Sequence, residues 1–135
     1  MKDIIRFKDI IEESLQKIDF PSTPKNLYEP IKYILSLEAK RIRSIALLIA
    51  HNLYNKDYTQ ALSAALAIEM FHNFTLIHDD IMDKASLRRN SKTVHEKWDD
   101  NIAILSGDAL LVKSYMMLSD INSKTRNSVL DRFSN

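Results

Sequence analysis

The chain has 135 residues, a length typical of one domain, and its 19 basic and 18 acidic side chains leave a formal net charge of +1. A nearly neutral chain has no broad positive field to recruit nucleic acid or an acidic membrane surface. The lack of cysteine excludes disulfides and cysteine-ligated zinc, and the single glycine, Gly107, argues against an all-β fold, tight hairpins and glycine-rich phosphate loops.

Hydrophobic residues that recur every three or four positions predict helices along nearly the whole chain. The long central helix is apolar on nearly all sides, as is typical of a buried helix, and Ser44 is a possible N-cap of the helix before it. The sequence predicts an all-α fold in one domain, residues 1–135, with no second domain. The expected elements are helices at 4–18, from within 25–30 to 37, 44–53, 58–82, 93–98 (a short helix or turn), 101–118 and from 123 onward, with a polar loop at 84–92.

The longest apolar run covers residues 45–50, far short of the roughly 20 residues that cross a bilayer. The first residues mix acidic and basic side chains and have no long apolar core, so they do not form a signal peptide. We therefore expect a cytoplasmic protein without a transmembrane segment.

The most informative stretch is residues 78–83, His-Asp-Asp-Ile-Met-Asp, at the end of the long predicted helix. Asp79 and Asp83 are four residues apart and share one helix face, where the negative end of the helix dipole increases their repulsion. A divalent cation removes that repulsion, and Mg²⁺ takes one or two carboxylates together with waters and substrate phosphates. We predict Asp79 and Asp83 as metal ligands, with Asp80 as an orienting residue or a further ligand.

Basic residues stand on both sides of this acidic motif. Lys40, Arg41 and Arg43 precede it, and Arg88 and Arg89 follow it within one loop. Arginine binds phosphate oxygens with two parallel bonds, and lysine supplies a point charge. Carboxylates, a metal and fixed cations together indicate a pocket for a diphosphate substrate.

Five blocks, at residues 38–44, 69–83, 87–90, 93–95 and 105–111, resemble in order and spacing the trans-isoprenyl diphosphate synthases, also called polyprenyl synthases. The resemblance implies an isoprenoid-synthase-type helical bundle, of which this chain has the N-terminal portion with about five to seven helices. It implies a prenyltransferase that uses Mg²⁺ to condense isopentenyl diphosphate with an allylic prenyl diphosphate. Asp79 and Asp83 would hold the metal on the allylic diphosphate, with Asp80 beside them. The resemblance assigns the allylic diphosphate to Arg88, and isopentenyl diphosphate to Lys40, Arg43, His72 and Arg89.

The resemblance also implies an apolar wall that shields a carbocation from water. Phe71 and Phe74 would form it together with Ile68 and Ile77, and Phe74 matches the position where the family places a bulky ring at the pocket floor. A short or medium product, such as C20, fits this position. His78 and His95 are expected to be structural.

Three positions depart from the family pattern: Ala39 and Asn90 replace glycine, and Ser44 replaces proline. Ala39 would strain the loop before Lys40 if a positive φ were required there, whereas asparagine tolerates that conformation. The family's second aspartate-rich motif has no counterpart after residue 111. We therefore expect the N-terminal half of a synthase, with feeble activity alone, in a homodimer or with a partner subunit.

Two alternatives remain open from the sequence. A non-catalytic or regulatory subunit of a heteromeric prenyl synthase would keep the fold without the second acidic motif. An HD-type metal phosphohydrolase would use His51, His78, Asp79 and Asp108 as metal ligands.

Overall fold

The computed structural model describes residues 2–135 and confirms the all-α prediction. Its elements are α1 (Lys2–Gln16), α2 (Lys25–Ser36), α3 (Ile42–Tyr54), α4 (Thr59–Met82), β1 (Leu87–Arg88), β2 (Ser91–Lys92), α5 (Val94–Lys97), α6 (Asp100–Ser119) and α7 (Ser123–Ser134). The periodicity located every helix of the described chain to within a few residues.

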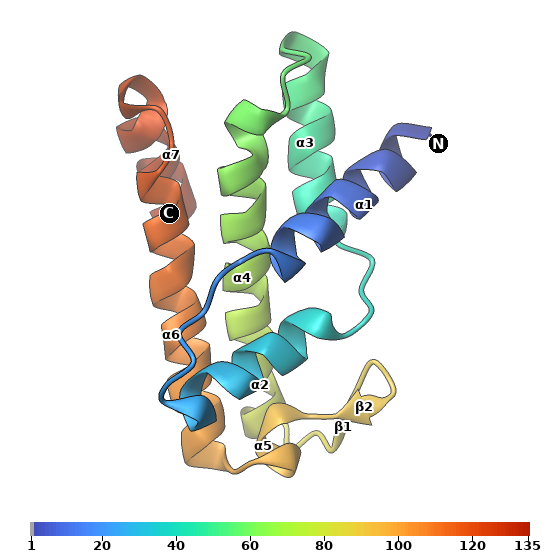
Figure 1. Cartoon of the computed structure of the whole chain (residues 1–135), viewed down its shortest axis with the longest axis vertical. Helices are drawn as coiled ribbons and strands as arrows, with labels where there is room; N and C mark the ends of the chain where they lie inside the picture. Colours follow the sequence, from blue (N-terminus) through green and yellow to red (C-terminus); the bar gives the residue numbers. More distant parts are fainter. Residues whose placement is uncertain (1) are drawn as a thin grey trace.

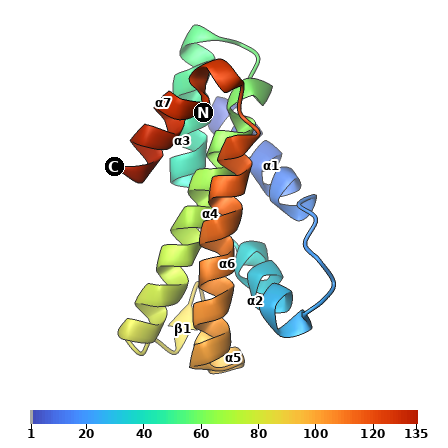
Figure 2. The ribbon, with the colours of Figure 1, turned by 90° about the vertical axis from the view of Figure 1, so that its left-hand side faces the viewer.

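The two longest helices, α4 and α6, lie side by side along the length of the molecule (Figures 1 and 2). α1 and α2 cross one side of this pair, and α3 packs along the first half of α4 (Figure 1). α5 and the β1–β2 ribbon lie at the end of the molecule where α4 finishes, and α7 folds back at the opposite end. The last turn of α4 therefore lies near α5 and the ribbon (Figure 1).

The core explains why α4 is apolar around most of its circumference. Met70 and Ile77 of α4 are fully buried together with Leu110 of α6, while Phe7 of α1 and Leu48 of α3 enter the same cluster from other sides. Each fully buried aliphatic or aromatic side chain of this size contributes about 1.5–3 kcal/mol relative to exposure. α4 is hydrophobic because it is buried against α1, α3 and α6, and not because it crosses a membrane.

α6 is the one described helix that is long and apolar enough to cross a membrane by length and composition. It packs against both α4 and α2, and the core helix of a globular protein passes the same test. Its Ala103, Ser106 and Gly107 are buried small residues that bring its backbone close to its neighbours.

The expectation that few glycines exclude a tight hairpin is wrong. β1 and β2 form an antiparallel ribbon in which Leu87 pairs with Lys92, and Arg89 and Asn90 take the turn with φ values of 53° and 60°. A left-handed residue other than glycine costs roughly 1–2 kcal/mol. The Tyr33 hydroxyl donates to the Lys92 carbonyl at 2.7 Å, which holds the ribbon against α2 and helps to offset that cost. The tolerance expected of Asn90 is confirmed.

The condition for strain at Ala39 is not met, because the left-handed residue in the segment before α3 is Arg41, with φ of 50°. The N-cap expected at Ser44 is wrong: Ser44 lies inside α3, which begins at Ile42. Its hydroxyl donates instead to Oε2 of Glu69 at 2.7 Å, because one turn into the helix it faces α4.

The buried side chain of Arg41 joins four helices. Its Nε donates to Glu12 of α1 at 2.8 Å, its Nη1 to Glu69 of α4 at 2.9 Å, and its Nη2 to the Leu35 carbonyl of α2 at 2.7 Å. Burial lowers the pKa of Arg41, but the bonds to Glu12 and Glu69 outweigh it and raise the pKa overall. Burial likewise raises the pKa of Glu69, and the bonds from Arg41 and Ser44 reverse this and lower it. Both groups are therefore charged in the folded chain.

We predict that Arg41→Met lowers the free energy of unfolding by about 3–5 kcal/mol, because it leaves the Glu69 carboxylate buried without its partner. Urea unfolding at pH 7 measures the change. Arg132→Met is the matched control, since Arg132 is exposed near the end of α7. Equal losses in the two variants would contradict the role given to Arg41.

Candidate functional site

The last turns of α4 carry the three predicted acidic residues in two different environments. Asp79 and Asp83 are exposed, and the backbone N–H of Asp83 donates to the Asp79 carbonyl at 2.8 Å, so the two residues lie one turn apart. Neither carboxylate makes an ion pair with another described residue. Two exposed, unpaired carboxylates on one face fit Mg²⁺, which keeps waters and phosphate oxygens in its remaining positions. No group of three possible metal-binding side chains occurs among residues 2–135, so a closed metal cage is not formed by the described chain.

Asp80 is 1% exposed and points away from this face. Its two oxygens accept bonds from Nε and Nη2 of Arg88, each at 2.7 Å. The bond to Asp80 raises the pKa of Arg88, burial opposes it, and the charges of Asp79 and Asp83 add to the rise. This geometry suits the orienting role for Asp80, because a two-pronged bond fixes the plane of the guanidinium beside the exposed carboxylates.

The predicted isopentenyl diphosphate ligands line one cavity of about 190 Å³ on the neighbouring side of α4. We call it the cation pocket. Its walls are formed by Ala39, Lys40, Arg41, Ile42, Arg43, Glu69, His72 and Arg89. Three parts of the chain therefore contribute to it: the segment before α3 together with the first turn of α3, the middle of α4, and the turn of the ribbon.

The pKa of His72 is lowered in this pocket, so its imidazole is neutral at pH 7. Burial is the main cause that lowers its pKa, followed by the charge of Arg43, and more weakly by Arg89 and Arg88 against an opposing effect of Glu69. Nη1 of Arg43 lies 3.1 Å from Nε2 of His72. Because a guanidinium can only donate, Nε2 is the acceptor and the imidazole proton sits on Nδ1. The Nδ1–H group is a donor that adds no further positive charge.

The ribbon turn brings Arg88 and Arg89 to different places. Arg88 meets Asp80 at the end of α4, whereas Arg89 enters the cation pocket, where its Nη1 donates to the Leu37 carbonyl at 3.4 Å. Burial, with the nearby charge of Arg41, lowers the pKa of Arg89. One turn thus links the acidic end of α4 with the cation pocket, which the sequence did not reveal.

The two aromatic residues predicted to form the apolar wall belong to a row of packed rings. Phe71 and Phe74 are partly buried, with ring centroids 5.6 Å apart, and Phe74 lies 4.7 Å from the ring of His78. Phe133 of α7 packs on Phe71 at 5.2 Å and was missed, because nothing in the sequence joins α7 to the middle of α4. Ile77 is 1% exposed within the core, so its expected place in an open wall is wrong.

The HD-type alternative is wrong for geometric reasons. Nε2 of His51 lies 3.0 Å from the Asp57 carbonyl, beside the start of α4. His78 is in the last two turns of the same helix, where its Nε2 is 3.5 Å from Asp108. Ligands at opposite ends of a 24-residue helix cannot share one metal.

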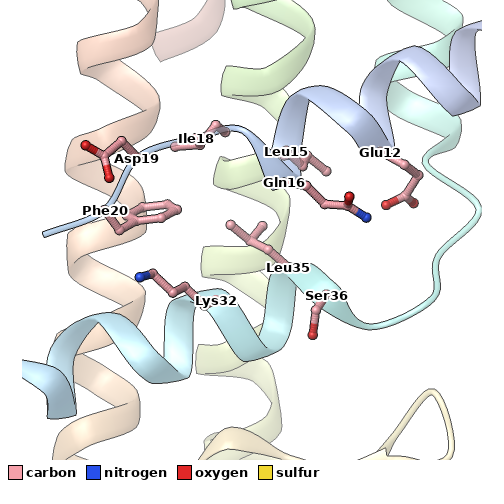
Figure 3. Close-up of a pocket in the computed structure, with 9 residues that line it drawn as sticks. All are labelled: Glu12, Leu15, Gln16, Ile18, Asp19, Phe20, Lys32, Leu35 and Ser36. Carbon is pink, nitrogen blue, oxygen red and sulfur yellow. The ribbon is translucent and has the colours of Figure 1, made fainter. Parts of the chain in front are cut away.

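A separate cavity of about 360 Å³ lies between the end of α1 and α2 (Figure 3). Glu12, Phe20, Lys32 and Leu35 are among its lining residues. None of the predicted site residues reaches it, so it is not part of the candidate site.

Comparison with known proteins supplies the family. The family model described as Polyprenyl synthetase matches residues 24–135. The chain belongs to this family. The geranylgeranyl pyrophosphate synthase of Geoglobus acetivorans is 37% identical over 120 residues, which cover 89% of this chain and 38% of that protein.

Solved structures agree with the assignment. A crystal structure of a geranylgeranyl pyrophosphate synthase superposes with a TM-score of 0.93 at 40% identity, over 97% of this chain and 40% of the other. A geranyltransferase from Helicobacter pylori, described as complexed with magnesium and isoprenyl diphosphate, superposes with a TM-score of 0.79 at 31% identity, over 95% of this chain and 46% of the other. The chain spans less than half the length of each of these relatives.

We predict that His72 titrates below 6.5, the ordinary pKa of histidine, and carries its proton on Nδ1 when neutral. Nitrogen chemical shifts of the imidazole, followed by NMR from pH 8 to pH 5, measure both properties. Arg43→Gln should raise the pKa towards the ordinary value without restoring it fully, because burial remains. Lys124→Gln on α7 is the charge-matched control and should change nothing. A native pKa at or above 6.5 would refute the description of the pocket.

Proposed function

We propose that this chain provides the diphosphate-binding half of a polyprenyl synthase that condenses isopentenyl diphosphate with an allylic prenyl diphosphate. The observation that supports it best is the pair of sites joined by the ribbon. Exposed carboxylates beside a fixed arginine lie at the end of α4, and a cation pocket lies next to them. A reaction between two diphosphates needs two such anion sites within reach of each other.

At the acidic end, Asp79 and Asp83 would hold Mg²⁺, with Asp80 orienting Arg88 towards the same diphosphate. The metal supplies charge neutralisation for the departing pyrophosphate when bound. Arg88 still has N–H groups that are not used by Asp80, so it can bind a phosphate oxygen while remaining fixed. The described magnesium complex of the related geranyltransferase supports Mg²⁺ as the cofactor.

In the cation pocket, Lys40, Arg43 and Arg89 would bind the diphosphate of isopentenyl diphosphate, and His72 would donate from Nδ1. The allylic carbon–oxygen bond breaks and its electron pair leaves with pyrophosphate. The double bond of isopentenyl diphosphate then attacks the allylic cation, and loss of a proton restores a double bond. The rings of Phe71 and Phe74 exclude water from the cation.

The relatives named as geranylgeranyl synthases support a C20 product, and the bulky Phe74 supports a pocket of limited depth. We also propose that the chain assembles as a homodimer or with a partner subunit. Leu105, Val112 and Met116 are exposed on α6 with helical spacing, and an exposed apolar stripe is typical of a surface that another chain covers. The proposed location is the cytoplasm.

The alternative function is a non-catalytic subunit of a heteromeric prenyl synthase. The matched part of residues 1–135 covers 38% of the relative from Geoglobus acetivorans, and residues 112–135 contain no second aspartate-rich block. Such a subunit would bind diphosphate without turning it over at a useful rate, so binding and turnover must be measured separately.

We predict Mg²⁺-dependent binding of farnesyl thiolodiphosphate by the full chain, observed as heat in calorimetry. Asp79→Asn together with Asp83→Asn should abolish this heat, because both proposed ligands lose their charge. Asp131→Asn, at an exposed carboxylate on α7, is the control and should bind like the native chain. Equal heat in native and doubly substituted chains would overturn the proposed metal site.

The same samples, incubated with farnesyl diphosphate, labelled isopentenyl diphosphate and Mg²⁺, separate the two functions. Slow elongation that depends on Asp79 and Asp83 supports the synthase half. Binding without any elongation, even with a partner half-chain added, supports the non-catalytic subunit.

A further inference from the structure

We propose that the contact between His78 and Gly107 sets the depth of the hydrocarbon pocket by fixing the ring of Phe74. This inference rests on the proposed function and deepens it. It makes His78 and Gly107 positioning residues that decide how long a prenyl tail the site accepts.

Gly107 is favoured because a side chain at this position would collide with its neighbours, and not because its backbone conformation needs glycine. No described glycine has a positive φ, so an alanine could adopt its helical conformation. A Cβ atom at Gly107 would nevertheless lie 2.6 Å from Nε2 and 2.7 Å from Cδ2 of His78, closer than real Cβ contacts. The imidazole of His78 therefore lies directly against the backbone of α6, where an added Cβ would force the imidazole to shift.

The His78 side chain is 29% exposed, and its buried part contacts residues besides Gly107. Its Nε2 is buried and has no hydrogen-bond partner among residues 2–135, although Oδ1 of Asp108 is 3.5 Å away. The ring of Phe74, one turn earlier on α4, meets it edge to face with a centroid distance of 4.7 Å and an interplanar angle of 62°. The imidazole thus contacts both Gly107 and Phe74, so a group added at Gly107 that displaces the imidazole also changes its packing against Phe74.

Phe74 is the phenylalanine ring nearest to Asp79 along α4. It precedes Asp79 by five residues, which is about 7.5 Å along the helix axis. Beyond it the row of rings continues through Phe71 to Phe133 of α7 and Tyr115 of α6, with successive centroids 5.6, 5.2 and 5.3 Å apart. A tail anchored by its diphosphate at Asp79 would thus run along these rings, and the position of Phe74 limits its length.

A double-mutant cycle tests the contact itself. Gly107→Ala should destabilise the chain in urea unfolding, although alanine has the higher helix propensity. In the His78→Ala background the same substitution should become stabilising, because the imidazole that it would strike is gone. Ser114→Ala, two turns further along α6, should have the same effect in both backgrounds. A Gly107→Ala effect of the same sign and size in both backgrounds would overturn the inference.

Calorimetry with Mg²⁺ and the thiolodiphosphates of geranyl, farnesyl and geranylgeranyl chains tests the consequence. Gly107→Ala pushes the imidazole towards Phe74, so it should weaken binding of the longest tail relative to the shortest severalfold. His78→Ala releases Phe74 and should shift the ratio severalfold in the opposite direction. Gly107→Ala could change from destabilising to stabilising in the His78→Ala background while the ratio of affinities for the longest and shortest tails stays the same. That outcome overturns this inference and leaves the proposed function intact. Absence of binding by the native chain to all three ligands overturns both.

Discussion

The position of both candidate sites depends on one buried guanidinium. Arg41 bonds to α1, α2 and α4 at once, while its left-handed backbone begins α3. Its side chain therefore points into the bundle, and its neighbours Lys40 and Arg43 stay at the surface around the cation pocket. A buried ion pair is weak as a source of net stability, because desolvation opposes the attraction. What it fixes here is the relative position of four helices, and a well-packed apolar substitute would not specify that arrangement through directed bonds.

The second constraint on the two sites is the β1–β2 ribbon, whose turn has a strained backbone. Arg89 and Asn90 both hold positive φ, a conformation that costs free energy for residues with a Cβ. Anchors on either side compensate: Asp80 holds Arg88, and the hydroxyl of Thr93 donates to the Ala85 carbonyl at 2.7 Å. The strained turn separates two adjacent arginines, so that one serves the acidic end of α4 and the other the cation pocket. Strain retained at such a place is typical of a functional segment.

The sequence predicted the helices and the acidic face well because both depend on local spacing. Asp79 and Asp83 share a face wherever a helix forms, and α4 had to be helical given its composition. The Asp80–Arg88 bond was not predictable, because it spans the connection between α4 and β1, and the spacing of residues does not give the path of that connection.

Arg41 was grouped with its exposed basic neighbours, since a sequence does not show burial. One signal could have separated it from them: Glu69 is the single acidic residue between positions 58 and 79. A single charged residue inside an apolar helix needs a buried partner of opposite charge. The basic cluster at residues 40–43 contains that partner, Arg41.

The acidic end of α4 and the cation pocket differ in net charge. This difference affects which of the two proposed diphosphate substrates each site would bind. At the end of α4, Asp80 neutralises Arg88, so Asp79 and Asp83 leave an excess of negative charge at the negative end of a helix dipole. A diphosphate is repelled there unless a divalent metal binds with it. In the cation pocket, Glu69 is paired with Arg41 and His72 is neutral, so Lys40, Arg43 and Arg89 leave an excess of positive charge. A diphosphate can bind there directly. Under the proposed function, this difference in charge would make one diphosphate site depend on metal and the other not, so that two diphosphates could occupy adjacent sites without competing for the same ligands.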